Sequence, residues 1–230
     1  EGAAGQPDRL RFIVVMRDPI MRAFSEWAMF SLGWNWDPVK NFSASMAYKL
    51  DDLRKCNRSL FMRPDRLRAL PTSELASYMR ECFRFGSATM YATTSMYGVC
   101  MLHALRYFRR EQFLVLRYED LMRMKGPEIL RALARFTGLH LNPRQLANPK
   151  CQPTRVYSRG GKAKGAKPKP KPNSYSSNSP FAAEMLQEAA APLERFFGPY
   201  NALLHEIMGT SFGWGRGDHR KTPLSAAESG

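Results

Sequence analysis

An arginine and a serine near the start of the chain have the types and spacing of an anion-binding pair. Arg17 follows the apolar run Phe12–Met16, which is typical of a buried strand, and Asp18 and Pro19 then suit the cap and first position of a helix. Arg17 is therefore expected where a strand ends and a helix begins. Free backbone N–H groups and the helix dipole favour phosphate oxygens at such a point. The guanidinium adds a planar fork of donors, and Ser25 follows on the same helix.

The same residues also fit a purely structural turn. A strand that ends in a solvated turn with an Arg17–Asp18 pair would need no ligand, and these residues alone do not separate the two interpretations. Arg22 lies three residues before Ser25, so the two side chains share a helix face.

Composition indicates a globular protein with an anionic partner. The chain has 230 residues, 44% of them hydrophobic, which favours one α/β domain with a proper core. The net charge of +15 favours a nucleotide, nucleic acid, anionic lipid or acidic polysaccharide as partner. The sequence has no run of 18 apolar residues, so no transmembrane helix is predicted, and Glu1–Gly5 does not resemble a signal peptide. Because the predicted strand at Phe12 follows almost directly, the chain is interpreted as part of a longer protein.

The four cysteines and four histidines show no metal-ligand spacing, so no metal site is predicted. Cys56 and Cys82 flank a polar stretch that contains prolines. A disulfide that closes this loop would fit an oxidising compartment, and two free thiols fit the sequence equally well.

The pattern of apolar residues predicts strands alternating with helices, typical of an α/β fold with a parallel sheet. Gly33–Pro38, with its two tryptophans, is predicted to be a loop, and 56–71 an irregular basic stretch. The predicted strands are 12–16 and 113–118, and the predicted helices are 20–33, 43–55, 72–83, 93–109, 127–137, 181–196 and 199–208.

A basic glycine-rich segment interrupts this pattern. Between residues 129 and 183 there is no Asp or Glu, and 159–172 combines glycines, lysines and a Lys-Pro repeat that favours an extended chain. Such a segment suits a solvated linker or a non-specific tether for polyanions. Composition alone favours this linker over the alternative, a loop whose N–H groups and lysines wrap a phosphate, and the segment is not a Walker A motif.

The pattern Arg-Asp-Pro-Ile-x-Arg-Ala-x-Ser after an apolar strand resembles the 3′-phosphate-binding motif of sulfotransferases that use PAPS (3′-phosphoadenosine 5′-phosphosulfate). This resemblance implies that Arg17 and Ser25 hold the 3′-phosphate. The segment Gly161–Gly165 is similar to the loop with which Golgi heparan sulfate sulfotransferases close over PAPS, so Lys162, Lys164 and Gly165 are implied phosphate contacts. That family has an Arg where this chain has Ala166.

A third block, Tyr97–Leu121, resembles Golgi carbohydrate sulfotransferases of the chondroitin GalNAc 4-sulfate 6-O-sulfotransferase type. Most of this block is interpreted as core, with Tyr97 as the one side chain assigned to the cofactor cleft. The resemblance spans about residues 10–209 and implies a P-loop-like sulfotransferase fold, a parallel sheet flanked by helices. Residues 1–209 are then the C-terminal portion of the domain, and 210–230 a disordered tail.

The resemblance also implies an activity and a location. The chain would transfer a sulfuryl group from PAPS, without a metal, to a hydroxyl of an anionic polysaccharide such as a glycosaminoglycan. The whole protein would be a type II membrane protein of the Golgi lumen, although this chain itself has no membrane segment. The family's N-terminal P-loop-like motif does not precede Phe12, so no catalytic base is assigned, and Glu26 and His103 are interpreted as structural.

The competing function is a basic protein that binds polyanions or nucleic acids without catalysis. It accounts for the charge and the Lys-Pro run, but not for the Arg17 and Ser25 motif, and no aromatic residues interleave with the basic run as base stacking requires. Nucleic acid is therefore not the expected partner. A nucleotide kinase is a third option, opposed by the missing Walker A motif.

Overall fold

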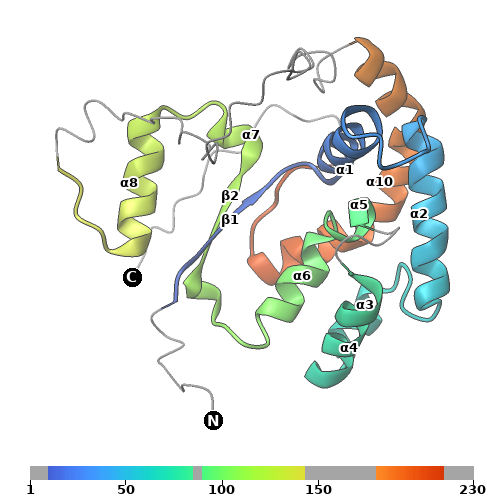
Figure 1. Ribbon diagram of the computed structural model, residues 1–230. Helices are drawn as coiled ribbons and strands as arrows, with labels where there is room; N and C mark the ends of the chain where they lie inside the picture. The colour runs from blue at the N-terminus through green and yellow to red at the C-terminus, as the bar shows by residue number, and fades with distance from the viewer. Residues whose placement is uncertain (1–9, 85–89, 143–179, 215–230) are drawn as a thin grey trace, which may run out of the picture. The chain divides into compact units, whose positions relative to one another are not determined.

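The computed structural model describes residues 10–84, 90–142 and 180–214, and within these the chain is mixed α/β, mostly helical, with a two-stranded parallel sheet (Figure 1). The described residues fall into two compact units. Unit 1 contains residues 10–16 and 111–142, and unit 2 contains 17–84, 90–110 and 180–214.

Unit 1 contains the sheet. Strands β1 (Phe12–Met16) and β2 (Phe113–Arg117) pair in parallel, with the Phe12 and Phe113 rings stacked 4.8 Å apart. The predicted strands and their parallel pairing are therefore confirmed. The prediction that 12–16 is a buried strand is wrong, because Ile13 and Val15 are about half exposed. Alternate side chains of a strand face opposite sides, and one side of β1 is open to solvent.

Two helices follow β2 in unit 1. They are α7 (Tyr118–Leu121) and α8 (Gly126–Thr137). Pro127 lies in the first turn of α8, and Gly138 ends it in the left-handed conformation, with φ of 73°. This confirms the predicted start and end of that helix, since proline needs no N–H partner there and glycine tolerates positive φ.

Unit 2 is helical and holds the hydrophobic core. Its helices are α1 (Pro19–Trp27), the π-helix η2 (Ala28–Gly33), α2 (Phe42–Cys56), α3 (Pro64–Ala69), α4 (Thr72–Cys82), α5 (Met90–Thr93), α6 (Tyr97–Ala104) and α10 (Pro180–Met208). The rings of Phe24, Trp27 and Phe42 meet at centroid distances of 5.2 to 5.6 Å and are almost completely buried. Helix α10 packs against α6, α1 and α2, so the C-terminal part of the chain completes this core.

Three predicted helical segments differ from the structure. The helix predicted over 93–109 is shorter in the structure, where α6 covers Tyr97–Ala104. Tight turns that Ser95 and Met96 close onto Ala92 and Thr93 separate it from α5, which ends at Thr93. The two helices predicted near 181–196 and 199–208 form the single helix α10, which contains both Pro192 and Pro199. The stretch predicted to be irregular contains α3.

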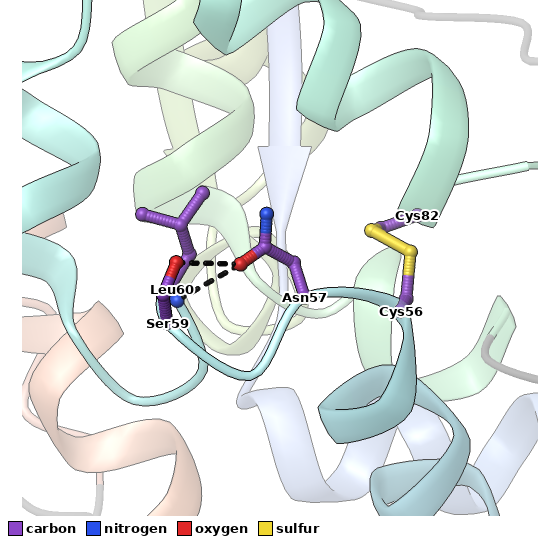
Figure 2. Close-up of a disulfide and its surroundings, with 5 residues drawn as sticks. All are labelled: Cys56, Asn57, Ser59, Leu60 and Cys82. Carbon is purple, nitrogen blue, oxygen red and sulfur yellow. Dashed lines mark hydrogen bonds between the residues drawn. A yellow bond between two sulfur atoms is a disulfide. The ribbon is translucent and has the colours of Figure 1, made fainter.

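Cys56 and Cys82 form a disulfide that joins the ends of α2 and α4 (Figure 2). Their Cα atoms are 5.8 Å apart, within the usual range. Beside it, the Asn57 side chain accepts hydrogen bonds from the Ser59 hydroxyl (2.8 Å) and the Leu60 N–H (3.2 Å). Of the two alternatives that the sequence left open, a disulfide and two free thiols, the structure contains the disulfide.

Candidate functional site

The cap at the start of α1 determines where an anion can be held. One carboxylate oxygen of Asp18 accepts the N–H groups of Ile20 and Met21, both at 2.9 Å, and Pro19 contributes no N–H. The predicted cap is therefore confirmed. It also corrects the expectation that free N–H groups at this helix end would bind an anion, because Asp18 already uses two of them. These two N–H groups are therefore not available to an anion, and the side chains nearby are the better candidates for holding one.

Those side chains line an open pocket along one face of α1 and η2. The pocket has a volume of about 270 Å³ and is lined by Arg17, Arg22, Ser25, Glu26 and Met29. The last four follow the spacing of three, four and seven residues that places side chains on one helix face. The structure therefore brings Arg17 and Ser25 together, and it adds the second guanidinium that the sequence had placed on this face.

Arg22 is held firmly at the edge of this pocket. Its Nη1 atom donates to Glu26 Oε2 (2.8 Å), to the Thr94 hydroxyl (2.6 Å) and to the Ser95 hydroxyl (3.2 Å). The Thr94 hydroxyl also lies 3.2 Å from Glu26 Oε2. These contacts all use one nitrogen, so they fix the guanidinium plane and position its other donors.

The turn between α5 and α6 supplies these hydroxyls because its own side chains bond to nearby backbone. The Thr94 hydroxyl contacts the Met90 carbonyl oxygen, and the Ser95 hydroxyl donates to the Tyr91 carbonyl at 3.0 Å. Such bonds to a carbonyl four residues earlier are typical of Ser and Thr in a helical turn. Sequence reasoning missed Thr94 and Ser95, since over 70 residues separate them from Arg22. Glu26 had a local signal, its i,i+4 spacing from Arg22.

Tyr97 lies beside Arg17 but outside the residues that line the pocket. Its hydroxyl accepts the backbone N–H of Arg17 at 3.4 Å, and its ring packs against Trp214 with centroids 5.7 Å apart. Tyr97 thus positions the backbone of Arg17. The predicted phosphate contacts Lys162, Lys164 and Gly165 lie outside the described residues.

The charge in the pocket suits a phosphate. Two guanidinium groups and one carboxylate leave a net positive lining, and the exposed Ser25 adds a donor that a phosphate oxygen can accept. An arginine fork matches phosphate geometry in a way that a lysine does not. The arrangement can bind and orient a phosphate group, and the residues present therefore fit the 3′-phosphate of PAPS.

Residues 10–84, 90–142 and 180–214 contain no group of three or more His, Cys, Asp or Glu side chains placed to hold a metal ion. Within the same ranges, no helix has both the length and the apolar character needed to cross a bilayer. Comparisons of the chain with models of protein families, with curated proteins and with solved structures found no match.

Proposed function

We propose that this chain belongs to a P-loop-like sulfotransferase domain that transfers a sulfuryl group from PAPS to a carbohydrate hydroxyl. The observation that carries the proposal is the shared pocket of Arg17 and Ser25, with Arg22 fixed beside them. Arg17 and Ser25 stand at the two positions where the sequence motif implies contacts with the 3′-phosphate, and Arg22 adds a second guanidinium to the same pocket.

In the proposed reaction, the acceptor oxygen bonds to the sulfur of PAPS while the bond between sulfur and the bridging phosphate oxygen breaks. The leaving nucleotide takes the bonding electron pair, and a base that the sequence does not identify takes the hydroxyl proton. Arg17, Arg22 and Ser25 bind and orient the donor through its 3′-phosphate, which is a positioning role. Lys162, Lys164 and Gly165 are proposed to contact its remaining phosphate oxygens, without a metal.

The disulfide and the charge support the rest of the proposal. A Cys56–Cys82 bond forms and persists in oxidising compartments, which fits the Golgi lumen and a type II membrane protein. A net charge of +15 favours an anionic polysaccharide acceptor.

Thermal unfolding in the presence of nucleotides tests the proposal. PAP (3′-phosphoadenosine 5′-phosphate) is expected to raise the melting temperature saturably at micromolar concentrations, and 5′-AMP, which lacks the 3′-phosphate, is expected to have a much smaller effect. The alternative, a basic protein that binds polyanions without catalysis, predicts no preference between the two nucleotides. It predicts instead a steep salt dependence with any polyanion.

A further inference from the structure

Two tryptophans next to the pocket are exposed on a loop that the structure holds rigidly. Trp34 is 52% exposed and Trp36 is 70% exposed, although indole rings are normally well buried. Their ring centroids are 4.8 Å apart at an angle of 48°. Single exposed apolar side chains are common, but large apolar side chains exposed next to one another are typical of binding surfaces.

Backbone hydrogen bonds fix this loop to the end of η2. The Trp34 N–H donates to the Met29 carbonyl at 2.9 Å, and the Trp36 N–H donates to the Phe30 carbonyl at 2.7 Å. Between the tryptophans, Asn35 has a φ of 58°, a left-handed conformation that asparagine adopts more readily than most residues and that local contacts hold in place here.

Lys40 supplies those contacts. Its ammonium donates to the Asn35 side-chain oxygen (2.7 Å) and to the carbonyl oxygens of Ser31 and Asp37 (2.5 and 2.9 Å). Three acceptors around one ammonium match its three protons, so the hydrogen bonds of Lys40 stabilise the conformation of the loop.

An aromatic layer beneath the tryptophans completes the support. Phe30 packs edge-on against Trp34 (5.2 Å) and tilted against Trp36 (5.5 Å), and its other neighbour is the buried ring of Tyr91 (5.9 Å). The exposed indoles are therefore pre-organised, and a ligand that stacks on them loses little of its binding energy to ordering the loop.

From these observations we infer that Trp34 and Trp36 form a stacking platform for a sugar ring of the carbohydrate acceptor. This inference rests on the proposed function for the choice of a sugar. Met29 links the two sites, since it lines the pocket and accepts the Trp34 N–H. Trp34 directly follows η2, which continues α1, so the platform lies next to the phosphate pocket but outside the residues that line it.

The shape of the platform favours a pyranose over a nucleotide strand. Because the indoles are tilted, a ligand can lie flat against only one of them, and the C–H face of a sugar ring needs only one. A strand of successively stacked bases would need parallel aromatic faces, and indoles at 48° to one another do not provide them. The overall positive charge then suits an acidic polysaccharide.

Binding of defined oligosaccharides tests the platform without requiring catalysis. We expect Trp36→Ala and Trp34→Ala to weaken binding of a chondroitin sulfate hexasaccharide about tenfold at 0.15 M salt, measured by calorimetry. Binding of unsulfated chondroitin should fall by a similar factor, since stacking does not depend on sulfate. Tyr48→Ala is the matched control, because Tyr48 is also 55% exposed in unit 2 but is not part of the platform.

The outcomes separate this inference from the proposed function. Unchanged oligosaccharide affinity in both Trp variants, or no binding by the parent protein, overturns the platform. If Trp36→Ala loses affinity for PAP but keeps its affinity for the glycan, the indole contacts the nucleotide base. That result also overturns the carbohydrate platform. If the parent protein ignores PAP but the Trp variants lose glycan binding, the platform stands and the proposed transfer fails. Circular dichroism and melting temperature check that each variant is folded.

Discussion

The Nη1 atom of Arg22 lies 2.6 Å from the Thr94 hydroxyl, which joins α1 to the turn between α5 and α6. The same nitrogen also donates to the Glu26 carboxylate. The carboxylate therefore already neutralises part of the charge of the Arg22 guanidinium, which faces the proposed phosphate site. Arg22 therefore has a fixed orientation and a reduced net charge. The fixed orientation favours anion binding and the reduced charge weakens it. A substitution that removes the charge of Glu26 separates the two effects.

Glu26→Gln should strengthen PAP binding. Glutamine keeps an oxygen that can accept from Arg22, so the orientation survives while the repulsion between carboxylate and phosphate disappears. For charges several ångström apart in a partly solvated site the gain is about 1 kcal/mol, or roughly fivefold in Kd by calorimetry. Weaker binding in Glu26→Gln would mean that the pocket selects a cation or that the carboxylate itself contacts the ligand.

Gly98→Ala should destabilise unit 2 by about 3 kcal/mol, measured by urea unfolding. A Cβ atom at Gly98 would lie 2.3 Å from the Tyr200 carbonyl oxygen and 3.1 Å from the Leu204 nitrogen, so α6 and α10 would have to separate.

Gly198→Ala is the matched control in the same pair of helices. A Cβ atom there meets nothing within 4 Å, so the variant should stay within about 1 kcal/mol of the parent protein. Equal stability of both variants would contradict the close packing of α6 on α10.

Reduction of the Cys56–Cys82 disulfide should lower the free energy of unfolding by about 3.5 kcal/mol, since the bond closes a loop of 26 residues. Urea unfolding with and without dithiothreitol measures this difference. The double variant Cys56→Ser/Cys82→Ser should match the reduced protein and show no response to dithiothreitol. A parent protein that is equally stable in both conditions would contradict a stabilising disulfide.

A buried ion pair predicts a particular pH dependence. Asp37 Oδ2 lies 3.1 Å from Lys49 Nζ, and both side chains are at least 90% buried. Burial tends to raise the pKa of Asp37, but the Val39 N–H, Lys49 and the Ser45 hydroxyl outweigh it and hold the pKa below its ordinary value. The folded state therefore binds this proton more weakly than the unfolded state does.

Asp37→Asn should consequently cost about 3 kcal/mol at pH 7, because it leaves Lys49 buried without its charge partner. The stabilisation by Asp37 is fully present above the pKa of the unfolded chain, near 4, and is lost as the pH falls through the lower folded-state pKa. The difference between parent and variant in urea unfolding should shrink over that range. A difference independent of pH would show that the ionised carboxylate is not the stabilising group.

Local patterns predicted the parts of this fold that depend on neighbouring residues. The apolar runs of β1 and β2, the Asp18 cap and the Gly138 end of α8 follow from propensity and spacing, and the structure confirms them. The sequence did not predict α10 as one continuous helix, because proline locally disfavours a helix. In the structure, the burial of Phe196 and Tyr200 against the core stabilises this helix.

The candidate site was predicted only in part, for the same reason. Arg17, Arg22 and Ser25 come from one short segment, so their meeting was visible in the sequence. Thr94 reaches Arg22 only through the packing of α5 on α1, and no local pattern signals that contact. The rigid exposure of Trp36 likewise depends on contacts from Lys40 that the sequence does not reveal.

The most direct test of the central claim is a calorimetric titration of PAP into the parent protein and the variants Arg17→Ala, Ser25→Ala and Arg58→Ala. The parent should bind with micromolar Kd, and loss of the Arg17 contact should weaken binding by about 1.5–3 kcal/mol, roughly 10- to 150-fold. Ser25→Ala should lose roughly tenfold. Arg58→Ala removes the same charge from an exposed position outside the pocket and should bind like the parent. Equal affinities across all four proteins, or no binding by the parent, would contradict the assignment of this pocket to the 3′-phosphate.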